Sequence, residues 1–128
     1  MTAAYAVHRL SGIVTPANAV YTADELAHQL KSSGAKAMFT CASLLGTATE
    51  AATKAGIDRE QIYLFSMPGE PKIFQPSHKT LEELIDRGSP LAPLPDLRFG
   101  KGQGAEQTAF LCYSSGTSGQ PVGASLPV

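Results

Sequence analysis

The chain has 128 residues, of which 43% are hydrophobic and 16% are charged, a balance typical of one globular domain and unlike that of a disordered chain. Ten basic and eleven acidic residues give a formal net charge of −1, so no excess field would gather nucleic acid or anionic lipid. No nucleic-acid partner is therefore expected.

The first predicted helix begins after Thr22. The run Thr22-Ala23-Asp24-Glu25 has the capping-box pattern, in which the threonine caps the helix and the glutamate reaches back. Gly34 can end this helix in a left-handed conformation. The run 36–41 (KAMFTC) that follows predicts a short buried strand.

A second helix is predicted from Ser43, as its N-cap, to Lys54, with Gly56 closing it. The continuous apolar run 61–66 (QIYLFS) is typical of a strand covered on both faces. Helix, strand, helix and strand in this order, with short links, predict an α/β fold with a mostly parallel sheet and flanking helices.

Residues 67–79 contain three prolines and are expected to form a loop. Thr80-Leu81-Glu82-Glu83 repeats the capping-box pattern and predicts a short helix to Arg87, ended by Gly88. The proline- and glycine-rich residues 89–107 are expected to run over the surface, and the apolar run 108–113 (TAFLCY) predicts a strand that needs neighbours to pair with.

The two cysteines, Cys41 and Cys112, lie in apolar runs, so we expect reduced, buried thiols. His8, His28 and His78 are scattered without the spacing of metal ligands, and no metal site is predicted. The N-terminus carries no basic segment followed by an apolar stretch, and no apolar run approaches the ~20 residues of a membrane-spanning helix. We expect an intracellular protein, cytoplasmic or peroxisomal.

The segment behind the last predicted strand, YSSGTSGQP from Tyr113 to Pro121, has a composition suited to binding an anion. Glycines let the backbone approach closely, exposed N–H groups form a nest, and hydroxyls add donors. Composition alone fits a flexible surface turn equally well. A Walker loop is excluded because no lysine follows Gly119, and a nucleophile elbow is excluded by the spacing of Gly116 and Gly119.

The order of these residues resembles the loop [YF]-[ST]-S-G-[ST]-[ST]-G-x-P-K-G of adenylate-forming (AMP-binding) enzymes, a superfamily that includes acyl-CoA synthetases. A second resemblance, to 4-coumarate-CoA-ligase-like members, lies upstream in GIVTPANAVYTADELAHQLKSSGAKAMFT. Its matching residues are Asn18, Tyr21, Thr22, Glu25, Leu26, Gln29, Leu30, Ser33, Ala35 and Lys36. The resemblance implies a partial three-layer α/β fold in which residues 1–128 are one incomplete N-terminal domain and residues 113–123 are the phosphate-binding loop.

The family joins a carboxylic acid to ATP as an acyl-adenylate and then transfers the acyl group to CoA. By resemblance, the ATP phosphates contact Ser114, Ser115, Gly116, Thr117, Ser118 and Gly119, with Mg²⁺ as a further cofactor and no catalytic residue in this chain. Thr117 is the expected hydroxyl donor. The implied partners are a nucleotide and a small carboxylic acid.

The sequence departs from the family loop after Pro121. Val122 stands at the lysine position, and only Gly123 of the following residues matches. This loss of similarity suggests an altered reading frame, a retained intron or an artificial end of the chain. We expect an inactive fragment of an acyl-CoA ligase, whose unpaired sheet edge favours self-association. The alternatives are a non-catalytic nucleotide- or anion-binding module and a structural interaction domain.

Overall fold

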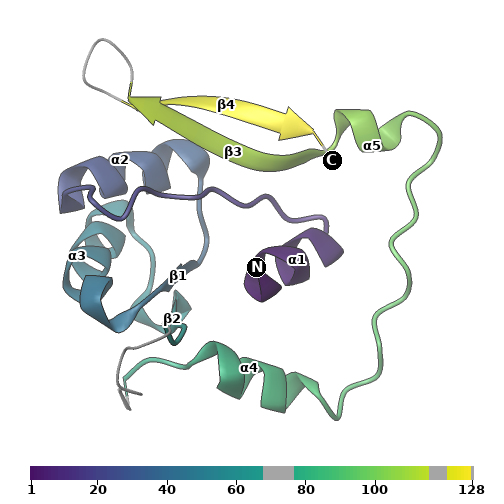
Figure 1. The fold of residues 1–128 in the computed structure, drawn as a ribbon, viewed down its shortest axis with the longest axis horizontal. Helices are drawn as coiled ribbons and strands as arrows, with labels where there is room; N and C mark the ends of the chain where they lie inside the picture. Colours follow the sequence, from purple (N-terminus) through teal and green to yellow (C-terminus); the bar gives the residue numbers. More distant parts are fainter. Residues whose placement is uncertain (68–76, 116–120, 128) are drawn as a thin grey trace. The chain divides into compact units, whose positions relative to one another are not determined.

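The computed structural model describes residues 1–67, 77–115 and 121–127. Its contacts divide the chain into two compact units, one made of residues 19–92 and the other of residues 1–18 with 93–128. Both units contain helices and strands, and the predicted α/β class is confirmed (Figure 1).

In the unit of residues 19–92, helix α2 (Ala23–Ser33) begins and ends where the sequence indicates. The backbone N–H of Thr22 donates to Glu25 Oε2 at 2.8 Å, and the N–H of Glu25 donates to Thr22 Oγ1 at 3.3 Å. Both halves of the capping box are therefore present. Gly34 follows with φ of 65°, a left-handed conformation that glycine adopts without a steric penalty.

Helix α3 (Leu45–Ala55) ends as predicted but starts differently. Gly56 closes it with φ of 74°. The prediction that Ser43 caps this helix is wrong, because a 3₁₀ turn, η1 (Ala42–Leu44), precedes the helix and Leu44 is the N-cap residue. The Ser43 hydroxyl instead lies 3.2 Å from the Cys41 sulfur.

Strands β1 (Met38–Thr40) and β2 (Ile62–Leu64) pair in parallel, as predicted, although each is shorter than the apolar run that contains it. The 3₁₀ turn η2 (Arg59–Gln61) leads into β2. On the other side of β2, the N–H of Leu64 donates to the Lys79 carbonyl at 3.0 Å. Thr80 forms a parallel bridge with Leu64, so the chain pairs with β2 where the predicted loop of residues 67–79 ends.

The core of this unit lies between α2, α3 and one face of the β1 and β2 pair. Its buried members come from all four elements and are Ala27, Leu30, Met38, Ala48, Ala51, Ala52 and Ile62. The small alanines of α3 let the two helices approach closely over the same strands. On the opposite face, the rings of Phe39 and Tyr63 lie 5.2 Å apart and remain partly exposed.

Helix α4 (Leu81–Gly88) begins with the second predicted capping box, in which Thr80 and Glu83 exchange bonds of 2.8 and 3.1 Å. It includes Gly88, where the sequence predicted its end. No residue of α4 is buried. Its apolar side chains therefore add little to the stability of the unit.

The other unit contains helix α1 (Thr2–Arg9), which the sequence did not predict, the short helix α5 (Gln103–Glu106), and strands β3 (Thr108–Ser115) and β4 (Pro121–Pro127). β3 and β4 pair in antiparallel fashion, with a register shift between Thr108 and Phe110. On the other side of β3, Val14 forms a parallel bridge with Phe110.

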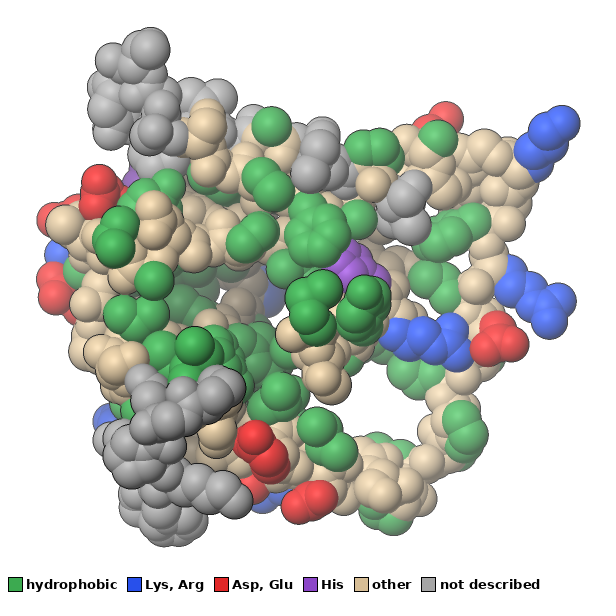
Figure 2. Space-filling view, in the orientation of Figure 1, with side chains coloured by type: hydrophobic (Ala, Val, Ile, Leu, Met, Phe, Trp, Pro, Cys, Tyr) green, Lys and Arg blue, Asp and Glu red, His purple; other side chains and the backbone are tan. Residues whose placement is uncertain are grey.

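Large apolar side chains remain exposed in both units, and Figure 2 shows several groups of them on the visible face. Examples are Tyr5, Leu10 and Ile13 in one unit and Ile85 and Leu91 in the other. Among the described residues, no helix is both long enough and apolar enough to cross a membrane.

Candidate functional site

The segment predicted to bind phosphate connects β3 to β4. β3 extends beyond the predicted strand and includes Ser114 and Ser115. Ser115 pairs with Pro121 and Ser114 pairs with Val122 across the hairpin. The two ends of the segment are therefore held on adjacent strands.

The predicted contact residues divide into two groups. Ser114 is exposed at the end of β3, and the backbone of Ser115 is the last described part of that strand. Gly116, Thr117, Ser118 and Gly119 lie outside the described residues. The phosphate contacts assigned to all six residues stay predictions.

The family loop has a lysine directly after its proline, and this chain has no lysine at that position. Val122 occupies that register position, directly opposite Ser114 on β3. Within the described residues of this hairpin, residues 108–115 and 121–127, no lysine or arginine occurs. Hydroxyls and backbone amides are therefore the donors that this hairpin contributes itself.

Two histidines have a buried Nε2 without a hydrogen-bond partner in the described part of the chain. His8, in the last turn of α1, packs edge-on against Phe110 of β3, with ring centroids 4.8 Å apart. His78 is 7% exposed, and its Nδ1 lies 2.9 Å from the Ser77 hydroxyl. Burial, with a smaller effect of the nearby Arg59 charge, lowers the pKa of His78. Neither ring is among the predicted site residues.

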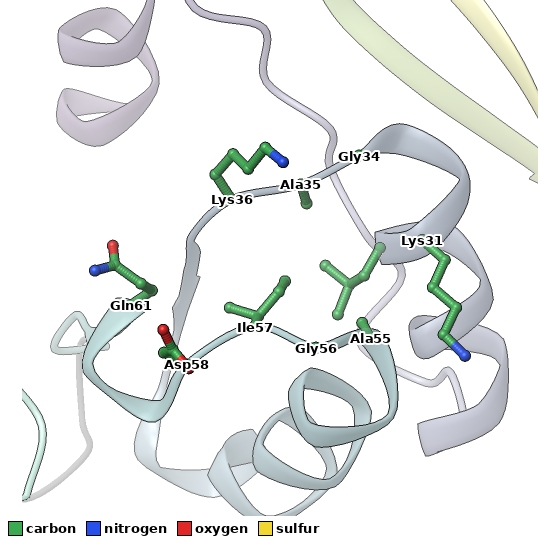
Figure 3. Close-up of a pocket in the computed structure, with 10 residues that line it drawn as sticks. Lys31, Gly34, Ala35, Lys36, Ala55, Gly56, Ile57, Asp58 and Gln61 are labelled. Carbon is green, nitrogen blue, oxygen red and sulfur yellow. The ribbon is translucent and has the colours of Figure 1, made fainter.

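A pocket of about 390 Å³ lies in the other unit, where α2 and α3 end. Its lining crosses from Ala35 and Lys36 to Ala55 and Ile57 (Figure 3). These residues precede β1 and β2, so the pocket lies at the amino ends of the parallel strands. Ligands of open α/β sheets bind at the carboxyl ends, and the pocket is therefore not the expected nucleotide site.

The structure describes no group of three or more histidine, cysteine or acidic side chains that could hold a metal ion within residues 1–67, 77–115 and 121–127. Cys41 and Cys112 are free thiols, Cys41 buried and Cys112 partly so. The donors of the hairpin suit an anion better than a cation, since any divalent ion would need oxygen ligands from elsewhere.

Comparison with known families decides the ancestry of the chain. The model of the family described as "AMP-binding enzyme" matches residues 1–127. The chain belongs to the AMP-binding enzyme family. The matched range extends past Pro121 into β4, although Val122 stands where the family loop has lysine.

Several curated relatives in the AMP-binding family are acyl-CoA ligases from fungi. An acyl-CoA ligase of Cordyceps militaris is 40% identical over 121 residues, which are 91% of this chain and 19% of the relative. An acyl-CoA ligase of Alternaria alternata is 43% identical over 117 residues, which are 90% of this chain and 20% of the relative. The chain spans about a fifth of the length of these relatives.

Solved structures of AMP-binding enzymes share the fold. An anthranilate CoA ligase in complex with anthranoyl-AMP superposes with a TM-score of 0.74 at 19% identity, covering 98% of this chain and 22% of that enzyme. A long-chain-fatty-acid-CoA ligase from Archaeoglobus fulgidus gives a TM-score of 0.70 at 26% identity, with the same coverage. The arrangement of helices and strands is therefore that of the N-terminal region of adenylate-forming enzymes.

The sequence indicated the candidate loop but not β4, the strand that follows it. Residues 121–127 carry no charge and include prolines at both ends, and they did not suggest a strand on their own. The alternation of Val122, Ala124 and Leu126 with Gly123 and Ser125 is a weak strand signal that was present.

Proposed function

We propose that this chain supplies the ATP phosphate-binding loop of an acyl-CoA ligase. Such a ligase converts a carboxylic acid and ATP to an acyl-adenylate and pyrophosphate, and CoA then displaces AMP to give acyl-CoA. The observation that carries the proposal is the family match over residues 1–127, which includes the hairpin around the loop. The acyl-CoA ligase names of the relatives support the same reaction class.

In this proposal Ser114, Ser115, Gly116, Thr117, Ser118 and Gly119 hold the ATP phosphates. Hydroxyl and amide donors aimed at phosphate oxygens stabilise the charge that develops there during nucleotidyl transfer. Mg²⁺ would supply further neutralisation of the phosphates, and CoA would be the second acceptor of the acyl group. The 128-residue chain alone is expected to be inactive, because it spans only about a fifth of its relatives.

Calorimetric titration of MgATP and of pyrophosphate into the chain tests the loop. Thr117→Ala and Ser115→Ala should each weaken binding roughly tenfold or more, since each removes a hydrogen bond to a charged ligand. Ser66→Ala, at an exposed serine after β2, is the matched control and should change nothing. Val122→Lys should tighten binding by adding a cation opposite Ser114.

The same titration separates the proposal from a structural domain, and an activity assay of the full-length ligase separates it from a non-catalytic binding module. A non-catalytic binding module would bind ATP in the same way, but a ligase carrying these residues in its full-length chain would lose activity with Thr117→Ala. A structural domain would bind neither ligand, with or without Val122→Lys. ATP-dependent acyl-CoA formation by the 128-residue chain would contradict the expected inactivity.

A further inference from the structure

The pocket of about 390 Å³ at the ends of α2 and α3 shares no residue with the candidate phosphate-binding loop. Its volume lies in the range of sites that hold small molecules. Of its lining residues, Ala35, Ala55 and Ile57 pack against the core of the unit of residues 19–92. Figure 3 shows the Ile57 side chain directed into the hollow. The apolar part of a ligand can therefore be buried here.

The backbone around the pocket is fixed by the way in which the two helices end. After α2, the N–H of Ala35 donates back to the Leu30 carbonyl at 3.0 Å. After α3, the N–H of Ile57 donates back to the Ala52 carbonyl at 2.9 Å. Each bond closes its helix end and turns the chain toward the next strand. The walls are therefore formed before a ligand arrives, which lowers the entropic cost of binding.

The wall at the end of α3 carries negative charge. The basic residue in the last turn of α3 is Lys54, whose ammonium lies 2.7 Å from the carboxylates of both Asp24 and Glu50. These carboxylates neutralise it, so the negative end of the α3 dipole is not offset at the pocket. Asp58 follows on the same wall and makes no ion pair within residues 1–67, 77–115 and 121–127.

The wall at the end of α2 carries positive charge. Lys31, in the last turn of α2, offsets the negative end of that helix dipole. Lys36, between α2 and β1, adds a second ammonium. Neither lysine makes an ion pair in the part of the chain that the structure describes. The pocket therefore combines an apolar surface with one positive and one negative wall.

We propose that this pocket binds a small zwitterion with an apolar body, a free amino acid or a short peptide. Its ammonium faces Asp58 and the end of α3, its carboxylate faces Lys36, and its apolar part contacts Ile57. A ligand with a single charge leaves one wall without a partner and brings like charges together at the other. A zwitterion pairs with both walls. The proposal concerns a second site and does not rest on the acyl-CoA ligase reaction.

Titration of L-leucine and of L-leucyl-L-leucine, followed by the amide resonances of the chain, tests the site. The amides of Gly34, Ala35, Gly56 and Ile57 should shift and saturate, whereas those of residues 108–115 should not move. Saturation by leucine identifies a free amino acid as the ligand, and saturation by the dipeptide alone identifies a short peptide. If neither compound shifts these four amides up to its solubility limit, the proposal is overturned.

Two analogues of leucine test the need for both charges. 4-Methylpentanoate lacks the ammonium and 3-methylbutylamine lacks the carboxylate, and each should bind roughly tenfold more weakly than leucine or worse, because one charged hydrogen bond is lost. Affinities equal to that of leucine would show that the apolar contact alone accounts for binding, which would overturn the proposal.

Variants at the two walls assign the charges. Asp58→Asn should weaken the binding of the zwitterion roughly tenfold without weakening that of 4-methylpentanoate, which has no ammonium. Lys36→Met should weaken the zwitterion without weakening 3-methylbutylamine. Both residues are exposed, so the variants should fold. Asp86→Asn and Lys101→Met, at exposed positions away from the pocket, are the matched controls and should change nothing. Equal losses for the zwitterion and the analogue would overturn the assigned pairing.

Discussion

The ammonium of Lys54 lies 2.7 Å from the carboxylate of Asp24, thirty residues earlier in the chain. Lys54 belongs to the last turn of α3, and Asp24 to the first turn of α2. A second carboxylate, that of Glu50, lies 2.7 Å from the same ammonium. One lysine thus joins the two helices that cover β1 and β2, with Asp24 also at the favoured positive end of its helix dipole.

Lys54→Met should lower the thermal midpoint slightly at low salt and by less at 1 M salt, because both partners are solvent-exposed and screened. Hydrogen bonding to Lys54 lowers the pKa of Asp24 and bonding to Asp24 raises the pKa of Lys54. A carboxyl group whose pKa is lower in the folded chain stabilises the fold at pH values above the pKa it has in the unfolded chain. The destabilising effect of Lys54→Met should therefore fade as the pH falls below about 4.

The same reasoning gives the highest pH at which the ion pair of Lys54 stabilises the fold. A lysine whose pKa is higher in the folded chain stabilises the fold at pH values below the pKa it has in the unfolded chain. That contribution should be lost as the pH rises beyond about 10. Lys36→Met is the matched control, since the structure describes no ion pair of Lys36 within residues 1–67, 77–115 and 121–127. Equal effects of the two variants at low salt would contradict the assigned link.

Thr22→Ala should lower the free energy of unfolding by about 1 kcal/mol, measured by urea denaturation. The substitution leaves the N–H of Glu25 without the threonine oxygen that caps it at 3.3 Å. Thr22→Ser keeps a hydroxyl at the same place and should lose much less. If serine and alanine cost the same, the hydroxyl would not be the stabilising group.

Ser11 and Gly12 should respond in opposite ways to substitution. Ser11 has φ of 56°, so Ser11→Gly should raise the free energy of unfolding by about 1 kcal/mol through relief of left-handed strain. Gly12 lies so close to Val7 that an added Cβ would be 2.7 Å from Val7 Cγ1 and 3.0 Å from its carbonyl oxygen. Gly12→Ala should therefore destabilise the chain.

Leu10→Gly is the control for this pair, because Leu10 has an ordinary φ of −99° and gains no relief from glycine. Chemical denaturation of the three variants measures the differences. A stabilising effect of Leu10→Gly comparable to that of Ser11→Gly would contradict the role given to the left-handed conformation.

His78 should make stability depend on pH below neutrality. Its folded pKa is lowered, so the unfolded chain binds more protons between the two pKa values, and stability falls as the pH drops below about 6.5. Urea denaturation at pH 8 and at pH 5.5 measures this loss. His78→Asn should be less stable at pH 8 but should show a smaller change between the two pH values; an unchanged pH difference would rule His78 out as its source.

The sequence predicted best those features that depend on a few adjacent residues. The capping boxes at Thr22 and Thr80 and the glycines after α2 and α3 act within one helical turn, so their patterns suffice. Ser43 carried the same kind of signal and failed, because its hydroxyl pairs with the Cys41 thiol and the chain first makes a 3₁₀ turn.

The features that escaped prediction depend on residues far apart in the chain. α1 lacks a side-chain cap, and its contacts are with distant residues, as in the bond from Arg9 to the Leu94 carbonyl. The strand character of residues 121–127 depends on pairing with β3. The candidate loop could be found from residue order alone, whereas the register that places Val122 opposite Ser114 could not.

The bridge between Val14 and Phe110 has a consequence for the order of folding during synthesis. The unit of residues 19–92 is continuous and can fold as soon as it leaves the ribosome. Residues 1–18 are made before residues 93–128, which include partners such as Gln107, whose side chain donates to the Ser11 carbonyl across 96 positions. At roughly 5–20 residues per second, that interval lasts on the order of 5–20 seconds. Residues 1–18 thus complete their contacts only after residues 93–128 have been made.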